Sequence, residues 1–385
     1  MHSSSQMPSP SSPSSQPQPS RLDSLAAAAA ANPQTGTSFC LDQTPCNDIT
    51  LSQHTKSGYY VRPEPTPEEA EVYLSKFRDW LTNFPFMHMP PGLTAKDLRR
   101  ERPFLWMVRE EVARRLVLNH ERTMDMLLGL LAYLGWATMN TGPGTKPFLI
   151  LYSQMAATIL FEMGLTRTPE EEQQCGLYLR VWSIRPAPPP KIRTMEERRA
   201  VLAFWFCTSV CTSFIGKMEA LGSTSHMDDC LAVLERDGEE PLDEVLVALV
   251  KIQLIGEEAH KLLRREVAGE TGQGPTYIFK AGLQSRLNEI QQRLPAKLHS
   301  HYVVQSQMYS VEAQVHSISL FADQSIPETM RISAKYACTK AARAWFDTFF
   351  AVPLMEVPGL PFAVYVSMSH MQAILYRLTT SEDPA

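Results

Sequence analysis

The stretch RTMEERRAVLAFWFCTSVCTSFIGKMEAL, residues 193–221, decides the fold class of this chain. It begins with a capping box, because Thr194 and Glu197 are spaced so that each side chain accepts from the other's backbone N–H at a helix start. Residues 201–215 are apolar except for threonine and serine, and Gly216 followed by Lys217 indicates the helix end. A helix that is apolar on nearly all sides belongs in the middle of a large helical core. We therefore predict a buried central helix here.

Helical periodicity, with apolar residues three and four positions apart, continues through most of the chain after residue 65. The other predicted helices cover residues 66–84, 94–119 with a break near 102–103, 123–139, 146–165, 243–265, 279–294, 303–321, 327–350 and 362–378. No segment shows the period-two alternation of a β-strand bounded by hairpin turns. The predicted fold class is all-α, a large multi-helix array behind a disordered N-terminal tail.

For three of these helices the spacing also predicts which side chains face the core. The expected core-facing residues are Tyr73, Phe77, Trp80, Leu81 and Phe84 in the first helix, Phe148, Leu151, Met155, Ile159 and Met163 in the helix over 146–165, and Val245, Leu249, Ile252, Ile255 and Ala259 in the helix over 243–265.

Residues 1–58 differ in composition from the remainder of the chain. Serine, proline and glutamine dominate the first twenty positions, and an alanine tract follows at 26–31. Such a segment cannot bury enough apolar surface to offset its ordering entropy, so we expect a disordered tail. Residues 59–385 are expected to form the helical domain.

Charge and cysteine content narrow the class of protein. The formal net charge is -5 and the pI about 6.1, which argues against a chain dominated by contacts with a phosphate backbone. The paired arginines, such as Arg198 and Arg199, have acidic neighbours on the same predicted helices, which favours solvated, salt-bridged faces. Seven scattered cysteines suit a reducing compartment. We expect neither a secretory signal nor a membrane-spanning segment.

No residue pattern predicts an active site. The glycine-rich segment 269–275 follows a helix rather than a strand and lacks the Gly-Lys-Ser/Thr of a phosphate-binding loop, so it is interpreted as a linker. His226 and Cys230 are placed on a short surface loop with no second ligand cluster. Cys207 and Cys211 are interpreted as a buried, reduced pair. We therefore predict no catalytic, cofactor-binding or metal-binding residues and no enzymatic activity.

Three ordered segments carry a family resemblance. They are FPF at 84–86 through PPGLT at 90–94 to ERPFL at 101–105, then ER at 121–122 with DMLLGLLAY at 125–133 and Trp136, then RTMEERRA at 193–200 with MEAL at 218–221. In this order and spacing they resemble the regulatory middle region of fungal zinc-cluster transcription factors. The match covers about residues 65–265 and looks closest to regulators encoded near secondary-metabolite genes.

The resemblance implies a large all-α domain that contributes to dimerisation, inhibition or effector response. In the family, DNA is contacted elsewhere, by a short module of six cysteines that holds two zinc ions. Before the helical region this chain has only Cys40 and Cys46, which are separated by five residues with no basic residue between them. No zinc ligand or DNA-contacting residue is therefore carried over, and direct DNA binding by this chain is not expected.

The function expected from the resemblance is transcriptional regulation or co-regulation of a fungal gene set, at least partly in the nucleus. The expected partners are a DNA-binding protein or a second subunit, and the family also implies a small-molecule effector. The alternative is a helical ligand-binding or scaffold protein with no role in transcription, because the apolar helices over 126–139, 147–165 and 200–216 could line a pocket.

Overall fold

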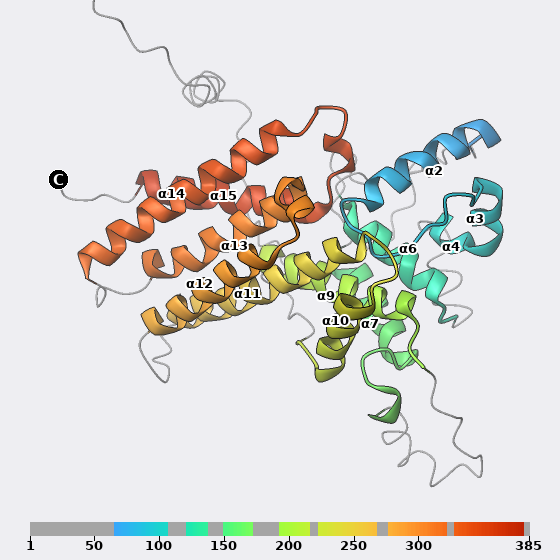
Figure 1. Ribbon diagram of the computed structural model, residues 1–385, viewed down its shortest axis with the longest axis horizontal. Helices are drawn as coiled ribbons and strands as arrows, with labels where there is room; N and C mark the ends of the chain where they lie inside the picture. The colour runs from blue at the N-terminus through green and yellow to red at the C-terminus, as the bar shows by residue number, and fades with distance from the viewer. Residues whose placement is uncertain are drawn as a thin grey trace, which may run out of the picture. The chain divides into compact units, whose positions relative to one another are not determined.

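The computed structural model describes residues 65–106, 121–137, 149–171, 192–215, 222–267, 276–321 and 327–380 (Figure 1). These residues form helices and the turns between them, and no strand occurs among them, which confirms the predicted all-α class. The tail predicted over 1–58 lies outside the described residues. Within the described part, no helix has the length and apolarity needed to cross a bilayer.

Twelve α-helices follow one another along the described residues. In chain order they are α2 (Pro67–Leu81), α3 (Ala95–Glu101), α4 (Pro103–Trp106), α6 (Met124–Gly135), α7 (Leu149–Glu162), α9 (Met195–Ile215), α10 (Ser225–Asp237), α11 (Asp243–Val267), α12 (Thr276–Arg293), α13 (Tyr302–Phe321), α14 (Glu328–Ala351) and α15 (Phe362–Thr380). Two short 3-10 turns, Ala296–Ser300 and Val357–Gly359, precede α13 and α15.

The predicted start of the central helix is confirmed. The backbone N–H of Thr194 donates to Glu197 Oε2 at 2.9 Å, and the backbone N–H of Glu197 donates to Thr194 Oγ1 at 3.1 Å. The same reciprocal pair starts α2 at Thr66 and Glu69. Each box satisfies two backbone donors that a helix start would otherwise leave without partners.

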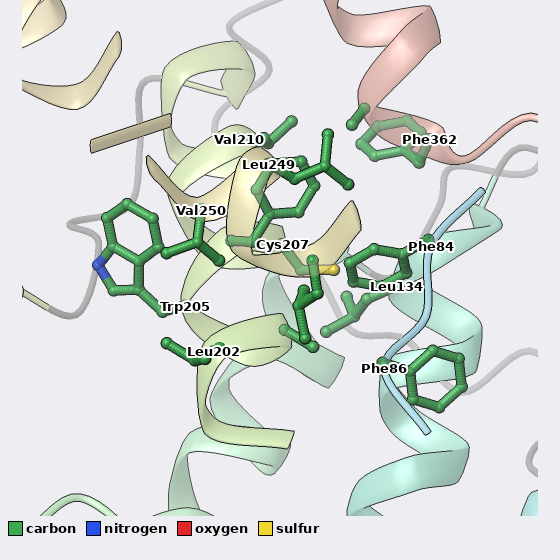
Figure 2. Close-up of a cluster of buried hydrophobic side chains, with 14 of the residues drawn as sticks. Phe84, Phe86, Leu134, Leu202, Trp205, Cys207, Val210, Leu249, Val250 and Phe362 are labelled. Carbon is green, nitrogen blue, oxygen red and sulfur yellow. The ribbon is translucent and has the colours of Figure 1, made fainter. Parts of the chain in front are cut away.

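Helix α9 lies inside the core, as predicted. Its residues from Ala200 to Thr212 are all buried, including Trp205 at 1% exposure. Helices α6, α7, α10, α11 and α15 all pack against it. Figure 2 shows Leu202, Cys207 and Val210 of α9 beside Leu249 and Val250 of α11, with Phe84 and Phe362 on another side. A helix surrounded by five others has no face left for water, which explains its apolar sequence.

A second interface joins α11, α13, α14 and α15, which lie side by side in Figure 1. Helix α14 turns Ala334, Cys338, Ala341 and Ala342 inward, and Cys338 Sγ lies 3.7 Å from the carbonyl oxygen of Ala313 on α13. These short side chains let the two helix backbones approach closely while keeping native packing density.

An aromatic cluster connects α2 and α6 to the turn before α15. Gly359 is the closest point of approach, since a Cβ added there would lie 2.5 Å from Trp80 Cδ1. The Gly359 carbonyl oxygen accepts from Trp136 Nε1 at 3.1 Å and from Asn83 Nδ2 at 3.2 Å. Phe84 links this cluster to α9, because its ring centroid lies 5.6 Å from that of Phe206.

The predicted inward face of α11 is confirmed, but those of α7 and α2 need correction. All five residues predicted for α11 are buried. On α7, by contrast, Leu151 is 48% exposed, and Tyr152 is buried with its ring centroid 4.4 Å from that of Tyr133 on α6. Tyr73 of α2 is 53% exposed. Helix α7 is apolar on nearly every side, so the contacts with neighbouring helices, rather than periodicity, choose the buried face.

Candidate functional site

The short surface loop predicted to carry His226 and Cys230, residues 222–230, is for the most part a helix. Only 222–224 form a loop, and residues from Ser225 onward belong to α10, where Thr224 Oγ1 accepts from the backbone N–H of Met227 at 3.2 Å. His226 and Cys230 are therefore four residues apart on one helix, and they face inward at 2% and 0% exposure. Thr224 provides a start signal because threonine is a favoured N-cap, and Met227, Leu231 and Leu234 have helical spacing.

His226 and Cys230 form a buried polar pair against α9. Cys230 Sγ lies 3.5 Å from His226 Nε2 and 3.8 Å from Arg198 Nη1. Arg198 in turn donates to Asp229 Oδ2 at 2.9 Å. Burial raises the pKa of Cys230 to about 11 and lowers the pKa of His226 below its ordinary value. The pair is a neutral thiol beside a neutral imidazole, so the geometry of a nucleophile and base is present without an ionised nucleophile.

The solvated face predicted for Arg199 is also wrong. Arg199 donates from Nε to Asp243 Oδ1 at 2.7 Å and from Nη2 to Asp243 Oδ2 at 2.9 Å, and the two residues are 4% and 2% exposed. Arg198 and Arg199 therefore pair with α10 and α11 rather than with the acidic residues of their own helix. A bidentate arginine–carboxylate pair of this kind fixes the relative position of the starts of α9 and α11. Away from water, each charge is stabilised only by the opposite charge beside it, so separating the two residues is unfavourable.

A chain of buried amides crosses the middle of the core. Gln253 of α11 donates from Nε2 to Ser209 Oγ of α9 at 2.9 Å, and Gln307 of α13 donates from Nε2 to Gln253 Oε1 at 2.6 Å. All three side chains are buried. Each amide orientation is fixed by its neighbours, so the chain of hydrogen bonds sets the register of three helices rather than presenting a group to a ligand.

Buried thiols and metal ligands offer no chemistry in the described part of the chain. Burial raises the pKa of Cys207 well above its ordinary value, and raises those of Cys211 and Cys338 to about 12. Protonated thiols are poor nucleophiles and poor metal ligands. Among the described residues, no three histidine, cysteine or carboxylate side chains lie close enough together to hold a metal ion.

One apolar cavity opens between α6, α9 and the start of α15. Phe84, Leu134, Phe206, Val210 and Phe362 are among the residues that line it, and Figure 2 shows Phe84, Leu134, Val210 and Phe362 there. Its volume is about 10 Å³, which barely admits one water molecule. The apolar helices around it fill one another's grooves, so the cavity is a packing defect rather than a ligand pocket.

The sequence did not predict the four polar contacts that cross between helices, Arg198 with Asp229, Arg199 with Asp243, Gln253 with Ser209 and Gln307 with Gln253. Their members are 31 to 54 residues apart along the chain, so only the folded helices bring them together. No sequence signal pointed to Gln253 or Arg199, because Gln253 was not among the predicted core residues and Arg199 was predicted to be solvated; burial, which would have required polar partners, is seen only in the structure. The glycine-rich segment predicted as a linker, 269–275, lies outside the described residues, as do Cys40 and Cys46.

Comparison with known proteins gives three relatives that are all named as transcription factors. The chain is 31% identical over 350 residues to "Transcription factor opdL" of Penicillium oxalicum, a match that covers 83% of this chain and 62% of that protein. It is 24% identical over 380 residues to a "Transcription factor" of Aspergillus terreus, covering 88% of this chain and 54% of that one. It is 22% identical over 348 residues to "Transcription factor himD" of Aspergillus japonicus.

No family model matches the chain, and no solved structure matches it. The chain spans 54% to 62% of the length of these three relatives, so each of them contains further sequence beyond the matched part. The matches nevertheless cover 82% to 88% of this chain. Along more than four-fifths of its length, the chain is thus similar to proteins named as fungal transcription factors.

Proposed function

We propose that this chain regulates transcription of a fungal gene set through its helical domain. The observation that carries the proposal is the 31% identity over 350 residues to a protein named as a transcription factor. A match of that length covers most of the residues that build the helical core, so the similarity concerns the folded domain rather than a low-complexity segment.

The character of the core supports this proposal. The inward-facing polar side chains, such as Arg199 with Asp243 and Gln253 with Gln307, bind one another across helices. The buried thiols are protonated. Such a core gives a stable scaffold whose surface carries the function, and we propose that the chain is not an enzyme.

We further propose that DNA is contacted by a partner, that the chain acts at least partly in the nucleus, and that its targets include secondary-metabolite genes. The support for a partner is the acidic balance of the chain, with a net charge of -5, which disfavours contact with a phosphate backbone. The support for the target class is the family resemblance of the three ordered segments.

Gene deletion followed by transcript profiling tests the proposed function. We expect a coherent set of transcripts to change in the deletion strain and to return when the intact gene is restored. Restoration with a Phe204→Asp variant, which cannot bury its charge in the core, is expected to fail. An unchanged transcript profile under several growth conditions would contradict the proposal.

The role of a partner has its own experiment. The purified chain is titrated against labelled genomic promoter fragments at physiological salt, alone and together with proteins that co-purify with it from nuclear extract. We expect sequence-specific binding only in the presence of the partner. Specific binding by the chain alone would overturn this part of the proposal while leaving a role in transcription intact.

The ligand-binding form of the alternative, a helical ligand-binding or scaffold protein, gains no support from the apolar cavity described above. Its basis was the set of apolar helices that could line a pocket. The cavity found between them, at about 10 Å³, is smaller by far than the several hundred Å³ of a small-molecule site.

A further inference from the structure

Lys280 lies on the inward side of α12 rather than on its solvent side. It precedes the buried Leu283 and Leu287 by three and seven residues, so the three side chains share the face that α12 turns toward the core. Helix α12 packs against α13 (Figure 1), and Lys280 Nζ donates to Ser319 Oγ of α13 at 2.8 Å. Lys280 is half-buried and Ser319 is 4% exposed, so the amine is held where the two helices meet.

The partner of this amine is a hydroxyl group and not a carboxylate. Within the described residues, Lys280 forms no ion pair. The Ser319 hydroxyl oxygen accepts a hydrogen bond from an ammonium group but does not neutralise its charge, so the charged form is poorly stabilised away from water. Burial accordingly lowers the pKa of Lys280 below its ordinary value.

The titratable groups closest to the amine are uncharged at neutral pH. His316 of α13 is a neutral imidazole, because burial and then Lys280 lower its pKa to about 4. Cys338 of α14 is a protonated thiol, because burial raises its pKa to about 12. Glu312 of α13 also lies near Cys338, but the cation near this carboxyl is Lys340. No neighbouring anion therefore holds Lys280 in its ammonium form, and a neutral amine is accessible.

We propose that Lys280 is a modification site that accepts an acyl group from a thioester. The Nζ lone pair attacks the thioester carbonyl carbon, an N–C bond forms as the C–S bond breaks, and the departing thiolate takes up the proton released by Nζ. This reaction requires an uncharged amine, which a desolvated lysine provides. The amide product keeps one N–H for the hydrogen bond to Ser319 Oγ, so the modification is compatible with the fold.

Imine formation with an aldehyde is the other characteristic reaction of an uncharged lysine. It needs a proton donor to expel water from the first adduct. At neutral pH His316 is already deprotonated, and the Cys338 thiol is 0% exposed and holds its proton. Acyl transfer needs no such acid, because the thiolate leaves with its own electron pair. The groups around Lys280 therefore favour a thioester over an aldehyde.

Lys251 of α11 provides a matched comparison in the same chain. It is also half-buried, but its Nζ pairs with Glu235 Oε1 at 2.5 Å. A carboxylate beside the amine favours the ammonium form, which has no lone pair for attack. The two lysines therefore differ mainly in the charge of the partner.

The test incubates the purified full chain with acetyl-CoA and follows acetylation at each lysine by mass spectrometry of proteolytic peptides. At pH 7 we expect Lys280 to react at least about tenfold faster than Lys251, because each unit by which a pKa is lowered raises the neutral fraction about tenfold. The rate at Lys280 should also reach half its maximum at a lower pH than the rate at Lys251. A lysine with a purely structural role would show neither difference.

Two variants change the partner of the amine. Ser319→Asp places a carboxylate beside Lys280 Nζ, and we expect acetylation of Lys280 to slow at least about tenfold while that of Lys251 is unchanged. Ser319→Ala supplies no charge, so fast acetylation should persist. Thermal melts verify folding. If Ser319→Asp does not fold, the pH profile of the unchanged chain and the result for Ser319→Ala still decide the question.

Any of four results would overturn the inference. They are acetylation of Lys280 no faster than that of Lys251, half-maximal rates at the same pH for both lysines, a folded Ser319→Asp variant that reacts as fast as the unchanged chain, and slow acetylation in a folded Ser319→Ala variant. Acetylation is measured on the purified protein, so these outcomes are independent of the deletion phenotype that tests the proposed function.

Discussion

Helices α9 and α14 are of similar length, 21 and 24 residues, but α9 is buried on all sides whereas α14 is buried along one face only. Helix α9 carries large apolar side chains on all sides and is enclosed by five other helices. Helix α14 packs with small residues along one face and exposes Ile332 and Tyr336 on the other.

The difference separates two uses of an apolar residue. In α9 an apolar side chain contributes to stability, because each one removes surface from water at about 25 cal/mol per Å². On the exposed side of α14, Ile332 and Tyr336 remain in water and contribute little to folding. Burial in the core therefore does not explain these two side chains.

The largest expected difference in the free energy of unfolding comes from placing a carboxylate in α9 and, for comparison, in α14. Phe204→Asp puts a carboxylate at a position of α9 that is 2% exposed, and we expect a loss of more than about 4 kcal/mol and no cooperative unfolding transition. Tyr336→Asp on α14 should change the free energy of unfolding by less than about 0.5 kcal/mol. Circular dichroism during thermal and urea unfolding measures both. Full thermal stability of the α9 variant would break the comparison.

The next largest loss of stability is expected when the buried ion pair between Arg199 of α9 and Asp243 of α11 is broken. Asp243→Ala removes both hydrogen bonds of the buried Arg199 and leaves it only the longer ion pair with Glu239 at 3.7 Å, and we expect a loss of about 3–5 kcal/mol. Asp347→Ala, which removes an exposed carboxylate from α14, is the matched control and should cost less than about 0.5 kcal/mol.

The double variant Arg199→Met, Asp243→Leu sharpens this measurement. It removes both charges, so its stability should return most of the way to that of the unchanged chain. If the double variant is as unstable as Asp243→Ala, loss of packing rather than the unpaired charge is responsible.

The turn after α14 is sensitive to a single methyl group. Gly359→Ala would place Cβ 2.5 Å from Trp80 Cδ1, and we expect a loss of about 1–3 kcal/mol by urea unfolding. Gly282→Ala on α12 has nothing within 4 Å of the added Cβ and should instead stabilise the protein by about 0.5–1 kcal/mol. Equal effects at the two glycines would show that Gly359 does not hold the turn against the aromatic cluster.

Lowering the pH is expected to reduce the free energy of unfolding gradually, through a half-buried histidine. Burial, and then the nearby Lys280, lower the pKa of His316 on α13 from 6.5 to about 4. Because the folded-state pKa lies below the unfolded one, its contribution is full above about pH 6.5 and is lost as the pH falls toward 4. We expect up to about 2 kcal/mol less stability at pH 5 than at pH 7. In His316→Gln this slope should flatten, and an unchanged slope would assign it to other histidines.

The helices and their starts were predictable because their signals are local. Thr194 with Glu197, and Thr66 with Glu69, are capping boxes written in four consecutive residues, and both form. The inward face of α11 was predictable because its polar and apolar residues are separated. The face of α7 was not, because apolar residues surround that helix, and its neighbours decide which of them are buried.

The polar residues of the candidate site show the same limit. His226 and Cys230 were predicted to lie on a short surface loop. In the folded chain, Asp229 points to Arg198 and the other face of α10 is buried. The pairing of Arg199 with Asp243, 44 residues later, depends on how two helix starts meet, and no periodicity reports that.

The sequence by itself determined that this protein is all-α, where α2 and α9 start, and that one helix is central, because capping and apolar content act over a few residues or along one helix. Only the tertiary structure decided which face of α7 is buried, which partner Arg199 takes, and that α14 leaves Ile332 and Tyr336 at the surface. These are properties of helix pairs far apart in the chain, and they follow from packing, which a local pattern does not encode.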